Sequence, residues 1–282
     1  MKIKLFIFSS LFCCVSSIAV ADEIVVTKVT GDLPINPQDT LWQQTPVQTV
    51  AMLAQQMTMP TLATASIDKL SVQAMHDSNN IVWRVSWADT TPDGNVDTAR
   101  FADAVALEFP LDQAAAPMMG NKGAKVQILY WKGLWQKDID EGFQDVQNLY
   151  PNFWSDLYWF AEGEFPYKIP ASFKNPVSHQ WFIAKQAGNP MSTFERSQPI
   201  EELSAEGWGT LTHQKESVTT GKGVWQNGQW VVTFARPLKT DDVNDHQFND
   251  KGQIAFAVWQ GGDKNVGGRK HWANWVTYQL QP

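Results

Sequence analysis

The chain has 282 residues, a formal net charge of −7 at pH 7 and 43% hydrophobic residues, which fits one large domain folded around its own core. The acidic balance argues against binding to nucleic acid and to anionic membranes. Tryptophan is unusually frequent, with 14 Trp against 5 Tyr. Such a density is typical of broad, flat packing between sheets, or of a surface that stacks on rings.

The first 21 residues are predicted to be a secretory signal, because two lysines precede an apolar stretch that ends in Ala-Val-Ala. Both cysteines, Cys13 and Cys14, lie inside this segment. The mature chain, residues 22–282, would therefore have no disulfide, no thiolate metal site and no covalent c-type haem. We expect a periplasmic protein of the Gram-negative type, exported and with no membrane span.

Short strands, indicated by alternating apolar residues, account for most of the remaining chain. They are expected at residues 80–87, 101–109, 126–130, 254–259 and 275–280, with a hairpin over 224–235 that turns at Asn227-Gly228. Helical patterns are weak and confined to residues 47–56, 138–149 and the segment around 199–204. This organisation predicts one mainly β domain, a β-sandwich with a few short helices in its connections.

The turn Pro117-Met118-Met119-Gly120 separates two of the predicted strands. A loop is an unusual place for two methionines, because thioethers prefer burial. Two interpretations remain open from the residues alone: the methionines fill a gap in the core, or one of them binds a cofactor.

Motifs of catalysis are absent from the sequence: there is no nucleophile elbow, phosphate-binding loop, dinucleotide fingerprint or His-Glu-x-x-His. The 5 histidines show no spacing typical of metal ligands. The sequence therefore gives no indication of an enzyme.

Several blocks occur in an order that resembles a known family: FADAVALEFP, PMMG and KVQILYWK in the first half, then residues 187–191, 199–203, 205–212, 223–225, 236–238 and 254–259. The family is the haem-binding one typified by the gamma subunit of ethylbenzene dehydrogenase. It includes the haem subunits of selenate and chlorate reductases and of dimethylsulfide dehydrogenase.

The resemblance implies a β-sandwich of immunoglobulin-like or DOMON-like type that holds one non-covalent haem b between a methionine and a lysine. By position in the motif the methionine is Met119, with Met118 as the fallback. The lysine is expected after the 205–212 block, where Lys215 is favoured and Lys222 and His213 are alternatives. Residues expected to line the pocket are Trp131, Trp208 and Trp225, and cations expected to pair with the propionates are Arg236, Arg269 and Lys270.

A methionine–lysine pair would leave no open position on the iron, so the resemblance implies electron transfer without catalysis. The expected partners are a molybdopterin catalytic subunit with an iron–sulfur subunit, or soluble c-type cytochromes. The alternative is a carbohydrate- or ligand-binding β-sandwich module without haem, because tryptophan-rich sandwiches also present stacking platforms to sugars.

Overall fold

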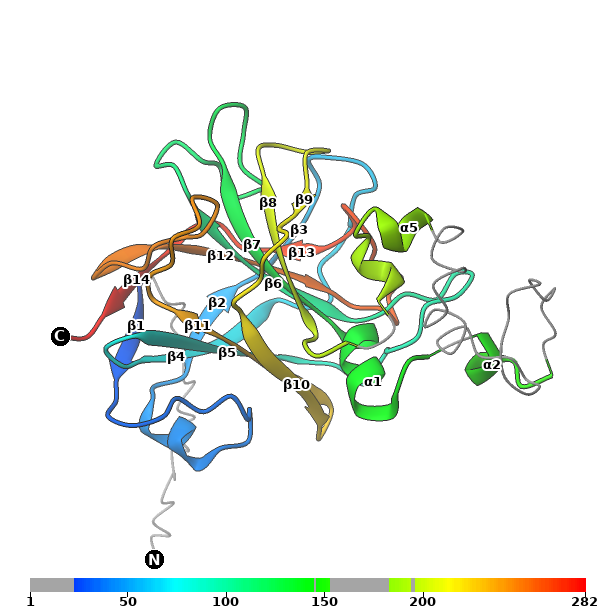
Figure 1. Ribbon diagram of the computed structural model, residues 1–282, viewed down its shortest axis with the longest axis horizontal. Helices are drawn as coiled ribbons and strands as arrows, with labels where there is room; N and C mark the ends of the chain where they lie inside the picture. The colour runs from blue at the N-terminus through cyan, green and yellow to red at the C-terminus, as the bar shows by residue number, and fades with distance from the viewer. Residues whose placement is uncertain (1–22, 145, 153–182, 194–195) are drawn as a thin grey trace, which may run out of the picture.

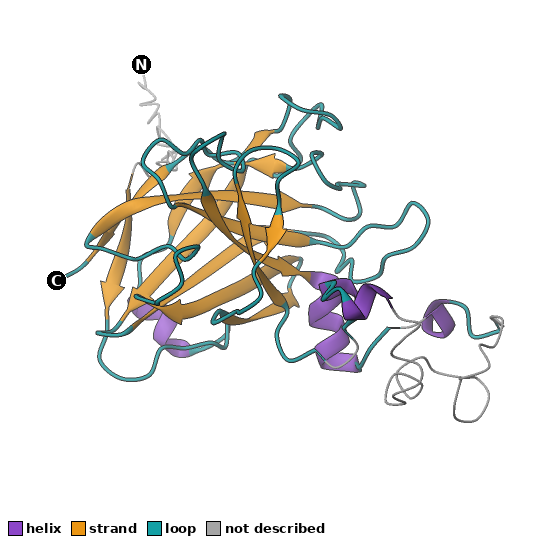
Figure 2. Cartoon of the chain, turned by 45° about the horizontal axis from the view of Figure 1, so that its top comes forward, coloured by secondary structure: helices purple, strands orange, loops and turns teal. Residues whose placement is uncertain are grey.

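The computed structural model describes residues 23–144, 146–152, 183–193 and 196–282, so the predicted signal at residues 1–21 lies outside the described part. Strands form the body of the molecule (Figure 2), and α1 and α5 lie at one end of it (Figure 1). The mainly β fold is confirmed. The strands are β1 (Glu23–Lys28), β2 (Gln48–Ala51), β3 (Leu53–Ala54), β4 (Lys69–His76), β5 (Asn80–Ala88), β6 (Ala104–Pro110), β7 (Val126–Lys132), β8 (Ile200–Ala205), β9 (Thr212–His213), β10 (Thr220–Gln226), β11 (Gln229–Pro237), β12 (Lys251–Trp259), β13 (His271–Trp272) and β14 (Val276–Leu280).

The strands pair into one continuous sheet that folds over into two layers (Figure 1). The first layer runs β10-β11-β5-β4 and also holds β2, which pairs with β4. The second runs β12-β6-β7-β8-β9, with β13 joining β12 to β3. The strands β1 and β14 connect the layers. β1 pairs in parallel with both β4 and β14, and β14 pairs antiparallel with β12.

Tryptophan forms much of the core between these layers. Trp83 packs on Phe109 with ring centroids 6.0 Å apart, and Trp131 packs on Trp230 at 4.8 Å and on Trp87 at 6.3 Å. These rings alternate along their strands with residues of the opposite face. The high tryptophan content therefore mainly reflects packing between the layers.

The outer face of the second layer carries its own apolar cluster, and many of its members are small. On β6 the large residues Val105, Leu107 and Phe109 point into the core, whereas Ala104 and Ala106 belong to the outer cluster. On β12, Ala257 and Trp259 likewise belong to the outer cluster. Small side chains leave space above a sheet, and the candidate site lies there.

The helices are α1 (Gly133–Glu141), α2 (Val146–Leu149), α5 (Ile183–Gln186) and the 3₁₀ helices η1 (Thr40–Gln44) and η2 (Pro190–Ser192). None of the helices in the described ranges is long and apolar enough to cross a membrane. The helix expected within 138–149 is present in part, because α1 begins earlier and α2 follows. Two other helix predictions are wrong: residues 47–56 contain β2 and β3, and residues 200–205 form β8.

Candidate functional site

A cavity of about 560 Å³ lies on the outer face of the second layer. Its floor is built from alternate residues of four neighbouring strands: Ala106 and Glu108 of β6, Ile128 and Tyr130 of β7, Leu203 of β8, and Ala255, Ala257 and Trp259 of β12. The walls come from three loops, at residues 55–59, 117–119 and 208–211, and from the segment 267–272. Both the volume and the apolar lining are typical of small-molecule and cofactor sites.

The methionine turn forms one wall of this cavity. Met118 is 8% exposed and Met119 is partly buried, and both line the cavity. Met119 adopts a φ of 67°, a left-handed conformation that costs a non-glycine residue about 1 kcal/mol or more. The turn is held by its backbone, because the Met119 N–H donates to the Glu108 carboxylate at 3.2 Å and its carbonyl accepts from the Gly207 N–H at 2.7 Å.

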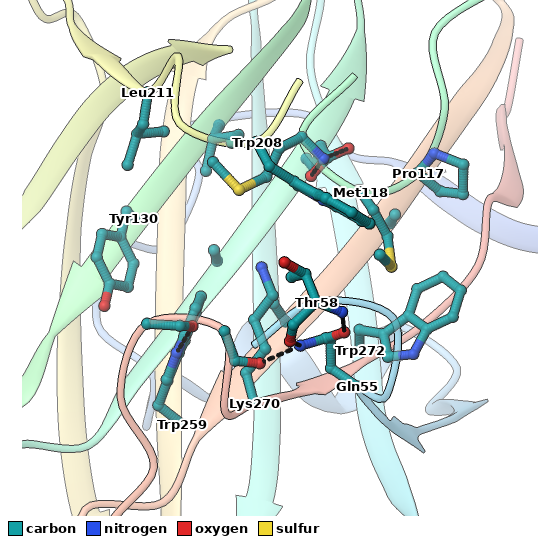
Figure 3. Close-up of a pocket in the computed structure, with 18 of the residues that line it drawn as sticks. Gln55, Thr58, Pro117, Met118, Tyr130, Trp208, Leu211, Trp259, Lys270 and Trp272 are labelled. Atoms are coloured by element: carbon teal, nitrogen blue, oxygen red, sulfur yellow. Dashed lines mark hydrogen bonds between the residues drawn. The ribbon is translucent and has the colours of Figure 1, made fainter. Parts of the chain in front are cut away.

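A lysine reaches the same cavity from the other end of the chain. Lys270 lies directly before β13, and Figure 3 shows it with Trp259 at the bottom of the view, below Trp208 and Met118. Its Nζ lies 5.0 Å from the centroid of the Trp259 ring. Burial lowers the pKa of Lys270, and the charge of Glu108 opposes that shift. The surroundings of Lys270 therefore favour the neutral amine more than the surroundings of a surface lysine would.

Glu108 lies on the cavity floor with little exposure. Burial raises the pKa of its carboxyl to about 7, while the positive charge of Lys270 and the Met119 N–H act in the opposite direction. The cavity thus brings together the thioethers of Met59, Met118 and Met119, an amine with a lowered pKa and a carboxyl with a raised one. Among these groups, the thioethers and the neutral amine are able to ligate a soft or borderline metal centre.

Gln55 fixes the position of the segment that carries Lys270. Its side chain is fully buried and donates to the carbonyls of Thr58 at 2.8 Å and Gly268 at 2.7 Å. Its backbone N–H donates to the Lys270 carbonyl at 3.0 Å. These bonds, two of which appear as dashed lines in Figure 3, join two walls of the cavity that are more than 200 residues apart in sequence.

Comparison with known proteins identifies the family. The family model described as ethylbenzene dehydrogenase matches residues 39–271, which include every strand of the cavity floor. The chain belongs to the ethylbenzene dehydrogenase family. The expected membership is confirmed.

Curated relatives in this family are named as subunits of oxidoreductases. A putative respiratory nitrate reductase heme subunit of Haloferax mediterranei is 26% identical over 93% of this chain and 74% of its own length. The dimethylsulfide dehydrogenase subunit gamma of Rhodovulum sulfidophilum is 24% identical over 88% of this chain and 76% of its own. The chlorate reductase subunit gamma of Ideonella dechloratans is 32% identical over 39% and 47%. The expectation that the chain is not itself an enzyme is confirmed by these relatives.

Among solved structures, a carbohydrate binding module of family 9 from Caldicellulosiruptor kristjanssonii in complex with glucose has a TM-score of 0.40 and 8% identity. The match covers 92% of this chain and 95% of the module. A similarity this low does not indicate which ligand the present chain binds.

The structure brings some of the predicted site residues together and separates others. Met118, Met119 and Trp208 line the cavity. Lys215 and His213 line a different depression, beside Ser204 and Asp242, and Lys222 is exposed on β10. His213 Nδ1 lies 2.9 Å from Glu201. The three candidates for a second ligand therefore do not line the cavity, and Lys270, which we expected to pair with a propionate, does.

Two tryptophans expected in the pocket lie elsewhere. Trp131 is fully buried in the core, because its neighbours Tyr130 and Ile128 occupy the outer face of β7 and alternation sends Trp131 inward. Gly223 of β10 leaves room for it, since a Cβ there would overlap the Trp131 ring. Trp225 packs against the same core and donates from Nε1 to the Asp89 carbonyl at 3.0 Å. Arg236 is also interior, paired with Asp245 at 2.9 Å.

Ala106, Ala255 and Ala257 are among the lining residues that sequence reasoning missed, and Lys270 was expected at the propionates rather than as a candidate ligand. A signal for the alanines was present, because small residues alternate with large ones in FADAVALEF and IAFAVW. A face of consecutive small residues on neighbouring strands indicates space above the sheet. Lys270 has no local signal of this kind.

Gly120 offers a test of the methionine turn that does not alter a lining side chain. Its φ is 69°, and a Cβ at this position would lie 2.6 Å from the Ala124 carbonyl oxygen. We expect Gly120→Ala to destabilise the protein by about 1–3 kcal/mol, because left-handed backbone and steric overlap both act against alanine. Urea unfolding measures the effect, and Gly123→Ala is the control. Gly123 also has a positive φ, of 83°, but open space around its Cβ, so an equal loss for both variants would contradict a tightly packed turn.

Proposed function

We propose that this chain is an exported, periplasmic b-type haem protein that transfers electrons as a subunit of a molybdopterin oxidoreductase complex. In this proposal Met119 and Lys270 are the axial ligands, with Met118 as the alternative methionine. The single observation that carries it is the apolar cavity in which the methionine turn and Lys270 line the same space. Lys270 replaces Lys215 in the proposal because Lys215 does not line this cavity.

The residues present fit a haem. The floor is apolar and made partly of small side chains, which suits a flat macrocycle, and Tyr130, Trp208 and Trp259 supply aromatic contact. The described part of the cavity wall offers no cysteine or histidine. Burial raises the pKa of the Tyr130 phenol and of the Glu108 carboxyl, which favours their protonated, weakly ligating forms, so thioether and amine are the better donors. A lysine ligand must be neutral, and burial of Lys270 lowers its pKa in that direction.

A bound b-type haem would supply a reversible one-electron carrier, and a methionine ligand would favour its ferrous form. The protein itself would position the two ligands and shield the haem from water. Met119 is pre-positioned by the Glu108 and Gly207 contacts, and Lys270 by Gln55. The apolar floor excludes water from one side. Trp208 is 51% exposed and Leu211 48%, so the cavity reaches the surface on the side where an electron partner would approach.

Subunit partnership is supported by the relatives, each named as a subunit of a reductase or dehydrogenase. We infer a catalytic molybdenum subunit and an iron–sulfur subunit, or a soluble c-type cytochrome, as partners of this chain. Export is supported by the signal-like residues 1–21. Removal of that segment on secretion, read from the N-terminal sequence of the purified protein, tests the location.

The test of haem ligation is an optical spectrum of the purified protein, oxidised and dithionite-reduced. Wild type is expected to show a six-coordinate, low-spin b-type spectrum in both states, because two protein ligands would hold the iron. Met119→Ala is expected to give a high-spin component and weaker haem retention. Met118→Ala, a change of the same size in the same turn, is the matched control and should leave the spectrum six-coordinate.

Reversal of the two methionine results would assign Met118 as the ligand and overturn the choice of Met119. A folded wild-type protein that stays colourless when haem is supplied would overturn the proposed function. Circular dichroism of each variant distinguishes loss of haem from loss of fold.

A further inference from the structure

A second cluster of chemically active side chains lies at one end of the sandwich, outside the cavity. Asp89 follows β5, Asp93 lies in the turn after it, and Asp103 directly precedes β6. One carboxylate oxygen from each lies within 4.8 Å of the others. Asp89 is 2% exposed and Asp103 fully buried, so this is not the usual solvated acidic loop.

The hydrogen bonds of the cluster are incomplete. Asp103 is well supplied, because Oδ1 accepts from the Gly261 N–H at 2.7 Å, and Oδ2 accepts from the Asp93 N–H at 2.6 Å and from Trp230 Nε1 at 2.9 Å. Asp89 Oδ1 accepts from the Thr91 N–H at 3.0 Å, but its buried Oδ2 has no partner among the described residues. A buried carboxylate oxygen without a partner is costly, so something should satisfy it.

Gln260 supplies an independent observation. It follows β12, its side chain is 8% exposed, and its Oε1 is buried without a donor among the described residues. Interaction with the Gln260 side chain lowers the pKa of Asp89, which places the two side chains close together. Three carboxylates and the Gln260 side chain thus lie close together, and two of their buried oxygens, Asp89 Oδ2 and Gln260 Oε1, lack partners among the described residues. Oxygen is the atom that hard cations bind.

The charge of the cluster is also uncompensated. None of the ion pairs described for the chain involves Asp89, Asp93 or Asp103. Burial raises the pKa of Asp89, and raises that of Asp103 to about 7 with a further contribution from the Asp89 charge. A buried group of like charges must therefore bind either a proton or a cation.

We propose that Asp89, Asp93, Asp103 and Gln260 form a calcium site. The donor set contains only oxygen, which excludes the nitrogen and sulfur coordination typical of zinc. Calcium accepts about 6–8 oxygens in flexible geometry, so backbone carbonyls or water would complete the shell. Magnesium demands a stricter octahedron and gives up water reluctantly, which makes it the poorer fit.

The position of the site indicates a structural role. Asp89 follows β5 of the first layer, whereas Asp103 precedes β6 and Gln260 follows β12 of the second layer. A cation there would join the two layers at one end of the sandwich. None of the four side chains lines the cavity proposed to hold haem. Calcium binding can therefore be tested independently of the proposed function.

The test is calorimetric titration of the EDTA-treated, full-length purified protein with CaCl₂, together with thermal melting in EDTA and in CaCl₂. We expect one ion per chain, a higher Tm in calcium and a much smaller effect of MgCl₂. Asp93→Asn is the preferred variant, because Asp93 is only partly buried and the fold should tolerate the change. Its calcium affinity is expected to fall by roughly tenfold or more, since even indirect partners of a metal site contribute about 10–100-fold.

The matched control is Asp97→Asn, four residues further along the same loop and outside the cluster, which should bind calcium as wild type does. Because Trp230 donates to Asp103, tryptophan excitation should also sensitise luminescence of bound Tb³⁺, and calcium should displace it. Wild type with no calcium heat and the same Tm in EDTA and calcium would overturn the proposal and leave a proton shared between the carboxyls. Equal loss of affinity in both variants would overturn the assignment to these side chains.

Discussion

Lys270→Gln is expected to abolish the six-coordinate spectrum of the haem-loaded protein and to weaken haem retention. Lys270 is the cavity lysine in the described structure, its pKa is lowered by burial, and its segment is fixed by Gln55. Glutamine keeps most of the side chain's length but is a poor ligand, so the iron would lose one axial bond. The measurement is the optical spectrum after haem reconstitution, with the haem content per chain.

Lys215→Gln is the matched control, because Lys215 lies in a separate depression and should retain the wild-type spectrum. The two variants test whether the lysine ligand is better chosen by its position in the sequence motif, as Lys215 was, or by its position in the cavity, as Lys270 was. A change in Lys215→Gln with an unchanged Lys270→Gln would show that position along the chain is the better guide and that the cavity is not the haem site. Unfolding curves for both variants exclude a general loss of stability as the cause.

Asp245→Asn is expected to cost about 3–5 kcal/mol in the free energy of unfolding, because it leaves a buried guanidinium without its counter-ion. Asp245 is 5% exposed and lies 2.9 Å from Arg236, which is 2% exposed. Gln127 completes the network by donating to Asp245 Oδ1 at 2.6 Å and accepting from Arg236. Asparagine has nearly the same shape, so the loss would be electrostatic rather than steric.

Urea unfolding, followed by tryptophan fluorescence, measures this effect. Asp241→Asn is the control: it removes the same charge from the same loop at an exposed position, and surface changes of this kind usually stay within about 0.5 kcal/mol. A loss below about 1 kcal/mol for Asp245→Asn would mean that water or neighbouring groups solvate Arg236 and that the pair contributes little.

The strands with clear alternation were predictable because their pattern is local. Residues 80–87 fall within β5, and the Asn227-Gly228 turn has positive φ at both positions, 51° and 74°, as a two-residue hairpin requires. The helix predicted around residues 199–204 was wrong for a tertiary reason. Glu201 and Glu202 make the segment look like a polar helix face, but Lys132 pairs with Glu201, and Thr219 donates to Glu202. Both glutamates are thus satisfied inside a sheet, which local propensity does not reveal.

The sequence by itself determined the family, from the order of short blocks along the chain, and the mainly β class and the methionine turn, which each depend on residues close together in the chain. Only the tertiary structure decided which lysine faces that turn. Lys270 reaches the cavity because β13 pairs with β12 on one side and with β3 on the other, and the β13–β3 contacts join residues more than 200 positions apart. The tertiary structure alone likewise brings Gln260 next to Asp89, which lies far away in the chain. Strand pairing over such separations is set by the packing of the whole sandwich, so no local pattern of residues encodes it.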